Sequence, residues 1–122
     1  MRLERGTVVL LELDPTRGHE QRGVRPCIIV SDPDVVADQR FPLMCVVPIS
    51  GTTAEGALYP PLAPGPSGLM KPSFALIEQL RSVDKRRIRR IFRTLRRSEL
   101  EAVDEGLRLF LGLEPVGQLE SR

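Results

Sequence analysis

The chain has 122 residues, of which 41% are hydrophobic and 28% charged, and its formal net charge is only +2. A chain of this size fits one domain with one modest core, so its function must lie on the surface or at a subunit interface. No apolar run approaches the roughly 20 residues that span a membrane. Residues 1–6 contain no apolar signal core, so we expect a cytoplasmic protein without a membrane partner.

Two cysteines and a single histidine are the soft metal ligands of the sequence. They do not form a recognisable zinc-binding set, so no metal and no other cofactor is expected. Cys27 and Cys45 lie in separate apolar segments. In a chain without a secretion signal, we expect both to be buried free thiols.

The basic residues are concentrated in one short stretch, which a mostly acidic segment follows at 99–105. This asymmetry indicates either a surface for a polyanion or a solvated arginine-rich face, and charge alone does not decide between them. The stretch contains Lys85, Arg86, Arg87, Arg89, Arg90, Arg93, Arg96 and Arg97.

Six segments are predicted to form strands, because they are short, rich in branched residues and bounded by turn residues. Asp84 is a candidate cap for a helical turn over 85–87 between the last two strands. Residues 14–24 and 50–57 read as loops, and 32–34 as a turn. The strands are expected at 7–13, 26–31, 43–49, within the proline-rich segment 58–72, at 73–83 and at 88–95.

The C-terminal region predicts an amphipathic helix over 99–111. Ser98 and Glu101 have the spacing of a capping box, and Gly112 is a typical stop. We therefore expect a mainly β fold of the α+β type, a small bent sheet or barrel with one helix packed on it, in a single domain at 1–113. The tail at 114–122 is predicted to be flexible. The apolar positions with helical spacing are Leu100, Val103, Leu107, Phe110 and Leu111.

Polar side chains stand beside the predicted strands in three places, at 18–26, 48–53 and 78–81. Arg25 is the most informative of them, because an arginine at the mouth of an apolar strand must find an anion or lose its solvation. A guanidinium suits a phosphate better than an ammonium does. Its structural alternative is an ion pair with Glu20 or Asp14.

These segments resemble the MazF/PemK family of toxins, and the resemblance covers nearly the whole chain with every segment in family order. Each match is weak alone, and together they are strong. Ser50 stands where the family usually has threonine, and His19 replaces a common serine. The matching segments are 6–9, 13–16, 18–21, 25–26, 30–31, 47–50, 78–84, 104–105 and 109–113.

The resemblance implies an SH3-like barrel of the MazF/PemK/CcdB type that works as a homodimer and is inhibited by a MazE-like antitoxin with an acidic tail. It also implies metal-independent cleavage of single-stranded RNA to 2′,3′-cyclic phosphate and 5′-hydroxyl ends, which inhibits translation and growth. Arg25 matches the catalytic arginine of the family, Glu20 the nearby loop glutamate, and Ser50 the hydroxyl residue. A shifted alignment would give the hydroxyl role to Thr52 or Thr53.

The chemistry fits these roles, because attack by a ribose 2′-hydroxyl needs an anionic transition state stabilised and two protons moved. Arg25 and Ser50 supply donors to the phosphate, whereas the base is Glu20, His19 or a water molecule. With four Phe, one Tyr and no Trp, base selection should depend on hydrogen bonds more than on stacking. The further residues expected to contact RNA are His19, Gln21, Thr52, Thr53, Gln79, Arg81, Lys85 and Arg86.

Two other functions remain open from the sequence. A gyrase poison similar to CcdB would use the same fold without needing Arg25, Ser50 and Glu20 to converge. A non-catalytic barrel that binds RNA or a protein would keep the basic stretch and tolerate the loss of Ser50. For the segment from Lys85 to Arg97, a wider RNA footprint, an antitoxin-binding face and a solvated face are all retained.

Overall fold

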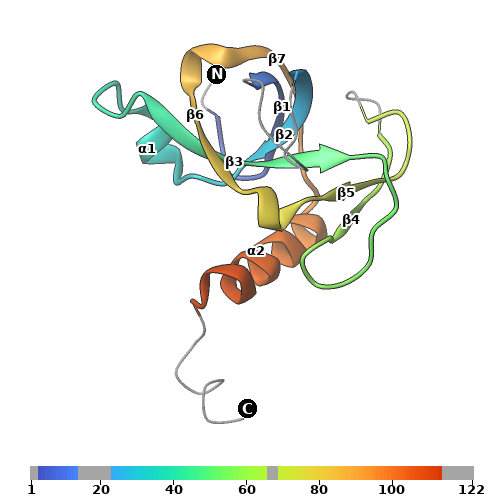
Figure 1. Cartoon of the computed structure of the whole chain (residues 1–122). Coiled ribbons are helices and arrows are strands. Elements are labelled where there is room, and N and C mark those ends of the chain that lie inside the picture. Colours follow the sequence, from blue (N-terminus) through green and yellow to red (C-terminus); the bar gives the residue numbers. More distant parts are fainter. Residues whose placement is uncertain (1–2, 14–22, 66–68, 114–122) are drawn as a thin grey trace.

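The computed structural model describes residues 3–13, 23–65 and 69–113. The described chain forms one bent antiparallel sheet with a long helix packed against one side (Figure 1). The mainly β fold with a C-terminal helix is confirmed. The helices and strands, in chain order, are β1 (Thr7–Leu13), β2 (Gly23–Ile29), α1 (Pro33–Ala37), β3 (Leu43–Ser50), β4 (Pro61–Leu62), β5 (Ser73–Ala75), η1 (Ile77–Gln79), β6 (Arg81–Asp84), η2 (Lys85–Arg87), β7 (Ile88–Thr94) and α2 (Arg97–Leu111).

The strand β3 organises the sheet, because its partners change along its length. The strand order is β4-β5-β3-β2-β1-β7, and β6 pairs with β3 outside this path. The first half of β3 pairs with β6, and its end pairs with β5, where Ser50 lies opposite Phe74. The end of β3 therefore has β2 on one side and β5 on the other.

The predicted single strand over 73–83 is wrong, because the 3₁₀ turn η1 divides it into β5 and β6. Ile49 pairs with Ala75 and Val46 with Arg81. Ile49 and Val46 are three positions apart on β3, whereas their partners Ala75 and Arg81 are six positions apart. The three additional residues are accommodated by η1. Ile77 in this turn is fully buried, so core packing overrides the strand propensity of the segment.

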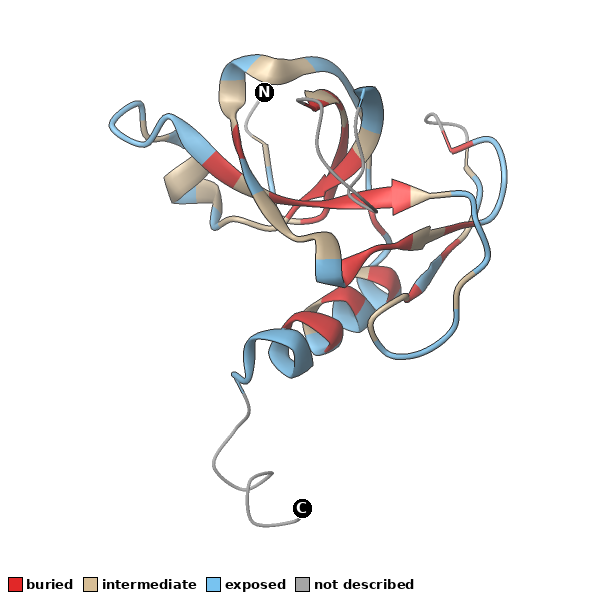
Figure 2. Ribbon diagram, viewed as in Figure 1, coloured by how far each residue is buried: buried red, intermediate tan, exposed pale blue. Residues whose placement is uncertain are grey.

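Apolar side chains form two clusters, one on each side of the sheet, as the alternation of β1 shows. The ribbon of β3 and the inner side of α2 are largely buried (Figure 2). Val8 belongs to the cluster that Val103 and Leu107 of α2 complete. Val9 and Leu11 belong to the other cluster, together with Cys27. Successive residues of a strand point to opposite faces, and both faces of β1 are therefore covered.

The helix α2 begins two residues earlier than predicted, and Ser98 and Glu101 do not cap it. The N-cap residue is Arg96, whose backbone N–H donates to the Glu99 carboxylate at 2.9 Å. An arginine side chain has no acceptor, so only this half of a capping box forms. Gly112 ends the helix in the left-handed conformation, with φ of 71°, as predicted.

The predicted apolar face of α2 is buried only in its first part. Val103 is fully buried, whereas Phe110 is 44% and Leu111 49% exposed, so the apolar face is not covered at the end of the helix. The segment read as a turn at 32–34 also differs, because Pro33 begins the five-residue helix α1 with Asp32 as its cap. No described helix is long and apolar enough to cross a membrane.

Both cysteines are free thiols. Cys27 is fully buried, as expected. Cys45 is only half-buried, which corrects the expectation for that residue.

Candidate active site

Arg25 on β2 and Ser50 on β3 lie opposite each other at the ends of neighbouring strands. Cys27 pairs with Pro48 in the β2–β3 ladder. Arg25 and Ser50 each lie two residues beyond this pair, so the period of two places them on the same face in facing positions. Both line a hollow of about 550 Å³. The sheet register thus brings together two residues that are 25 positions apart in the sequence.

The hollow is cationic and polar. Arg25 and Lys71 contribute positive charge, and no Asp or Glu of the described chain lines it. Two cations on one surface favour an anionic ligand, and their side chains provide charge-assisted donors for phosphate oxygens. The lining residues are Arg25, Pro26, Ile49, Ser50, Gly51, Thr52, Leu69, Met70, Lys71 and Ser73.

The hydroxyl of Ser50 is oriented by the loop that follows β3. The backbone N–H of Thr52 donates to Ser50 Oγ at 3.1 Å, a local bond that serine commonly makes in turns. Because a hydroxyl can accept and donate at the same time, this bond leaves the Ser50 proton available for a ligand. Thr52 lines the same hollow, whereas Thr53 is exposed and does not.

Gln79 and Arg81 lie away from this hollow, in η1 and at the start of β6. Arg81 pairs with Val46, which in turn pairs with Ile29, so Arg81 shares the sheet face of Arg25. One guanidinium nitrogen of Arg81, Nη1, is buried without a hydrogen-bond partner in the described structure. Burial raises the pKa of the Cys27 thiol to about 12, and the positive charge of Arg81 opposes this shift.

Lys85 and Arg86, both predicted to contact RNA, make bonds within the protein. The Lys85 ammonium donates to the carbonyl oxygens of Val35 at 2.7 Å and Asp38 at 3.0 Å, at the end of α1, where a helix terminus favours a cation. Arg86 forms an ion pair with Asp84 at 2.9 Å and lowers the pKa of that carboxyl to about 2. Asp84 also caps η2 as predicted, accepting from the Arg86 N–H.

Other residues of the basic stretch also have partners within the molecule. Arg89 pairs with Glu12, and Arg93 with the nearly buried Glu99 at 3.1 Å. The Arg90 guanidinium lies 5.3 Å from the centre of the Phe92 ring. The stretch is therefore less available to a polyanion than its sequence suggests. The remaining predicted site residues, His19, Glu20 and Gln21, lie outside the described residues.

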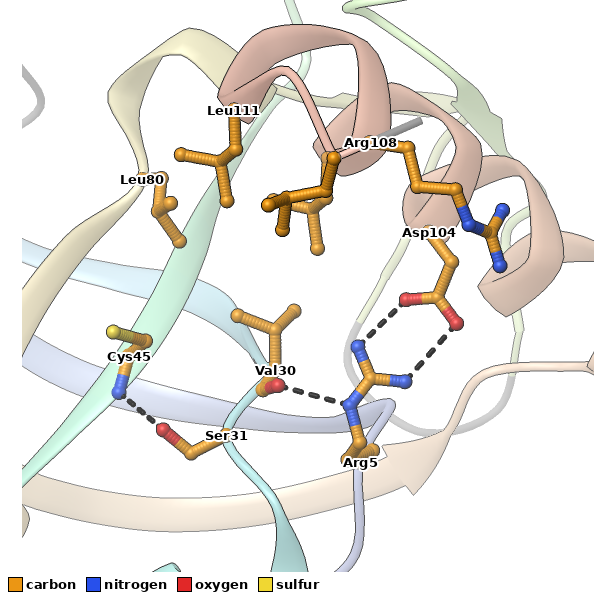
Figure 3. Close-up of a pocket in the computed structure, with 10 residues that line it drawn as sticks. Arg5, Val30, Ser31, Cys45, Leu80, Asp104, Arg108 and Leu111 are labelled. Carbon is orange, nitrogen blue, oxygen red and sulfur yellow. Dashed lines mark hydrogen bonds and ion pairs between the residues drawn. The ribbon is translucent and has the colours of Figure 1, made fainter. Parts of the chain in front are cut away.

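A second hollow of about 450 Å³ lies between α2 and the sheet and contains none of the predicted site residues (Figure 3). Its rim carries Arg5, which pairs with Asp104 through two hydrogen bonds of 3.0 and 2.6 Å and donates to the Val30 carbonyl at 2.9 Å. Leu80 and Leu111 give the hollow an apolar lining. Arg5 is already engaged by Asp104 and the Val30 carbonyl, so its charge does not favour an anionic ligand in this hollow.

Lys71 is the residue of the candidate site that the sequence analysis missed. It belongs to the proline-rich segment and to none of the recognised motifs. One signal was present, because Lys71 is the only basic residue between Arg40 and Arg81. An isolated cation in a stretch with no other basic residue indicates a specific position for the charge, although only the fold shows where it lies.

A bent antiparallel sheet with one packed helix and a cationic hollow at its strand ends defines a small barrel-type protein suited to an anionic ligand. A family model described as "PemK-like, MazF-like toxin of type II toxin-antitoxin system" matches residues 4–111. The chain therefore belongs to the MazF/PemK family of toxins, which are typically endoribonucleases. The family predicted from the sequence is confirmed.

Solved structures agree with this assignment. MazF from Deinococcus radiodurans is 26% identical with a TM-score of 0.76, and the match covers 92% of this chain and 98% of that one. A MazE–MazF structure from the same organism is 25% identical with a TM-score of 0.73, covering 93% and 99%. The Mycobacterium tuberculosis toxin MazF-mt6 shares the fold at 20% identity and a TM-score of 0.74, covering 89% and 99%.

Proposed function

We propose that this protein is the toxin of a type II toxin–antitoxin system and cleaves single-stranded RNA, without a metal ion, in the hollow formed by Arg25 and Ser50. The observation that carries the proposal is the convergence of a guanidinium and an oriented hydroxyl in a hollow that no described carboxylate lines. A phosphodiester is the anion in RNA that such a site fits.

The proposed reaction is an internal displacement at phosphorus. The ribose 2′-oxygen forms a bond to its own phosphorus, the bond to the 5′-oxygen breaks, and a 2′,3′-cyclic phosphate and a 5′-hydroxyl result. Arg25 places fixed donors against the non-bridging oxygens, where negative charge develops in the transition state. Ser50 adds one further hydrogen bond. These charges and donors perform the electrostatic work that a metal ion would do.

Two protons must also move, one from the 2′-hydroxyl to a base and one onto the departing 5′-oxygen. We propose Glu20 as the base, with His19 or a water molecule as the alternatives. Thr52 lines the hollow and would contact the RNA there. Arg81, on the same face of the sheet as Arg25, and Gln79, in η1, would bind RNA farther from the hollow.

We propose two protein partners. The relative that was solved as a MazE–MazF structure supports a MazE-like antitoxin as the inhibitor of this chain. A second copy of the chain, forming a homodimer, is the other partner that the family membership supports. We place the active protein in the cytoplasm, where its RNA substrate is made.

The experiment that tests this function uses the purified protein, a defined single-stranded RNA and EDTA. We expect the parent to cut the RNA and leave cyclic-phosphate and 5′-hydroxyl ends, and the Arg25→Ala variant to leave it intact. Arg40→Ala is the matched control, because Arg40 is exposed and pairs with Asp38 outside the hollow. This control should cut like the parent.

Two outcomes would contradict the proposal. Loss of cleavage in EDTA would reject the metal-independent reaction. Intact RNA with the parent, in repeated trials with long RNAs of mixed sequence, would favour the gyrase poison or the non-catalytic binding protein, since neither of them cuts RNA.

A further inference from the structure

The end of the Lys71 side chain lies against Gly51, the residue after Ser50. A Cβ atom placed on Gly51 would lie 2.4 Å from Lys71 Cε and 2.8 Å from Lys71 Nζ. A side chain at position 51 would displace the end of this lysine from the place it has beside Ser50. The missing side chain of Gly51 therefore leaves space for the Lys71 ammonium, one residue along the chain from Ser50.

The backbone of Lys71 is fixed by the strand that follows it. Ser73, which is only 5% exposed, donates a hydrogen bond from its hydroxyl to the Lys71 carbonyl at 3.1 Å. Ser73 begins β5, and the next residue, Phe74, pairs directly with Ser50. The β3–β5 ladder thus sets the position of Lys71 relative to Ser50, although 21 residues separate them in the sequence.

Ser50 lies between two cations. The strand order β5-β3-β2 puts the Lys71 segment on one side of Ser50 and Arg25 on the other (Figure 1). All three residues line the same hollow, and no described Asp or Glu does. A lysine ammonium is a compact charge with three donors and does not require the two-point geometry of an arginine. Such a group suits the oxygens of a phosphate whose orientation another residue has already set.

We propose that Lys71 is a second cationic substrate-binding residue of the cleavage pocket and holds an RNA phosphate on the side of Ser50 opposite Arg25. It acts by charge and keeps its proton throughout. Gly51 is the positioning residue, because its missing side chain admits the lysine. This inference rests on the proposed function and adds the residue that completes the phosphate-binding site.

Three variants test the proposal. Lys71→Met removes the charge and keeps the aliphatic part of the side chain, whereas Lys71→Arg keeps the charge. Gly51→Ala keeps the lysine but places a methyl group in the space that its ammonium occupies. The φ angle of Gly51 lies outside the left-handed region, so alanine fits the backbone there. Lys71 is exposed, and the two lysine variants should therefore fold like the parent, as thermal unfolding will check.

The probe is a short RNA made around a cut that the parent produces in a longer RNA. One version is all-ribose and reports kcat/KM. The other has a single 2′-deoxynucleotide at the cut, which removes the nucleophile and reports binding alone. We expect Lys71→Met to lower affinity by roughly 10- to 100-fold, the range for a hydrogen bond to a charged group. The slope of log affinity against log salt should fall by about 0.7, as expected for one single-strand phosphate contact.

We expect Lys71→Arg to restore affinity and cleavage to within a few-fold of the parent, and Gly51→Ala to weaken both in the direction of Lys71→Met. The double variant Gly51→Ala/Lys71→Met should be no weaker than Lys71→Met alone, because both changes remove the same contact. If the losses of affinity in the two single variants add up in the double variant, the positioning role of Gly51 is overturned.

If the parent cuts RNA and Lys71→Met binds and cuts equally well with an unchanged salt slope, the Lys71 proposal fails and the proposed function stands. If Lys71→Arg loses as much cleavage as Lys71→Met, the proposal that the lysine acts by charge is overturned in favour of proton transfer. If the parent leaves the longer RNA intact, the proposed function itself fails before Lys71 is tested.

Discussion

The hydroxyl of Ser50 is held by one backbone hydrogen bond, from the Thr52 N–H at 3.1 Å. We expect Ser50→Ala to lower kcat/KM by roughly 10²–10³-fold, the usual effect of removing one donor to a developing oxyanion. Ser50→Thr should retain activity, because it keeps the hydroxyl and adds only a methyl group. A fluorogenic single-stranded RNA measures both rates.

Ser98→Ala is the matched control for this prediction, since it removes the hydroxyl of an exposed residue on α2 that lies outside the lining of the hollow. It should cut at a rate close to that of the parent. If Ser50→Ala stays active while Thr52→Val is inactive, the hydroxyl of the reaction belongs to Thr52 and the assignment of this loop is shifted by two residues.

At this scale, the sequence showed which side chains had the right chemistry but not which of them would meet. Arg25 and Ser50 were predicted from the resemblance, and the β2–β3 register then places them opposite each other. Arg25 is exposed, so the cost of burying its guanidinium was the wrong reason for singling it out. Lys71 was not found, because its position depends on the β3–β5 pairing and on the space at Gly51. Neither of these follows from local sequence.

The helix α2 is fixed against the sheet by a close contact at a glycine. A Cβ atom on Gly106 would lie 2.9 Å from the Ala57 carbonyl oxygen and 2.9 Å from Ile77 Cγ1. The carbonyl belongs to the backbone and cannot rotate away, so an added methyl group must push the helix outward. Close packing thus requires glycine at a position where helix propensity favours alanine by about 1 kcal/mol.

We expect Gly106→Ala to reduce the free energy of unfolding by about 1–3 kcal/mol, the usual cost of overpacking a core. Chemical denaturation with urea measures the change. Glu105→Ala is the control, because Glu105 is exposed on the same helix and its ion pair with Arg108 is at the surface, so its effect should stay within about 0.5 kcal/mol. A more stable Gly106→Ala variant would show that the helix does not pack as closely as described.

The start of α2 shows why local motifs can mislead at the scale of an element. Ser98 and Glu101 have the capping-box spacing, yet Glu99 binds the Arg96 N–H. Glu99 is the better partner because it also accepts from the Ala63 N–H at 2.9 Å and pairs with Arg93. Tertiary contacts therefore decided between two carboxylates that local propensity treats alike, and Glu101 was left exposed.

At the scale of the whole molecule, the class of fold could be predicted because most strands and the helix are encoded locally by branched residues, turn residues and helical spacing. The division of 73–84 into two strands could not be predicted, since it arises where the β3 partners change and Ile77 enters the core. The exposed end of α2 was missed for a similar reason. Its apolar pattern continues to Leu111, but Phe110 and Leu111 remain exposed, and Leu111 lines the open hollow between α2 and the sheet.

Glu99 joins the start of α2 to β7 and to the segment after β4, and this arrangement makes the stability of the molecule depend on pH. Its carboxylate is bound by Arg93 of β7, by Ala63 after β4 and by the start of α2. Burial alone would raise the pKa of Glu99, but the hydrogen bonds from Arg93, Arg96 and Ala63 outweigh it and lower the pKa below its ordinary value of 4.5.

A lowered pKa in the folded state means that the unfolded chain binds the proton more readily. The stability contributed by ionised Glu99 is therefore fully present above pH about 4.5, and it is lost as the pH falls through the lower pKa of the folded protein. We expect Glu99→Gln to reduce the free energy of unfolding at pH 7 by about 3–5 kcal/mol, because it leaves the nearly buried Arg93 without its counter-charge.

The difference between the parent and Glu99→Gln should shrink as the pH is lowered from 5 to 3, because protonation makes the parent carboxyl neutral as well. Urea denaturation across this range measures both proteins, with Glu101→Gln as the exposed control on the same helix turn. The control should differ from the parent by no more than about 0.5 kcal/mol at every pH. A Glu99→Gln deficit that stays constant down to pH 3 would mean that the charge of Glu99 contributes nothing, and that the carboxyl acts only through its shape and neutral hydrogen bonds.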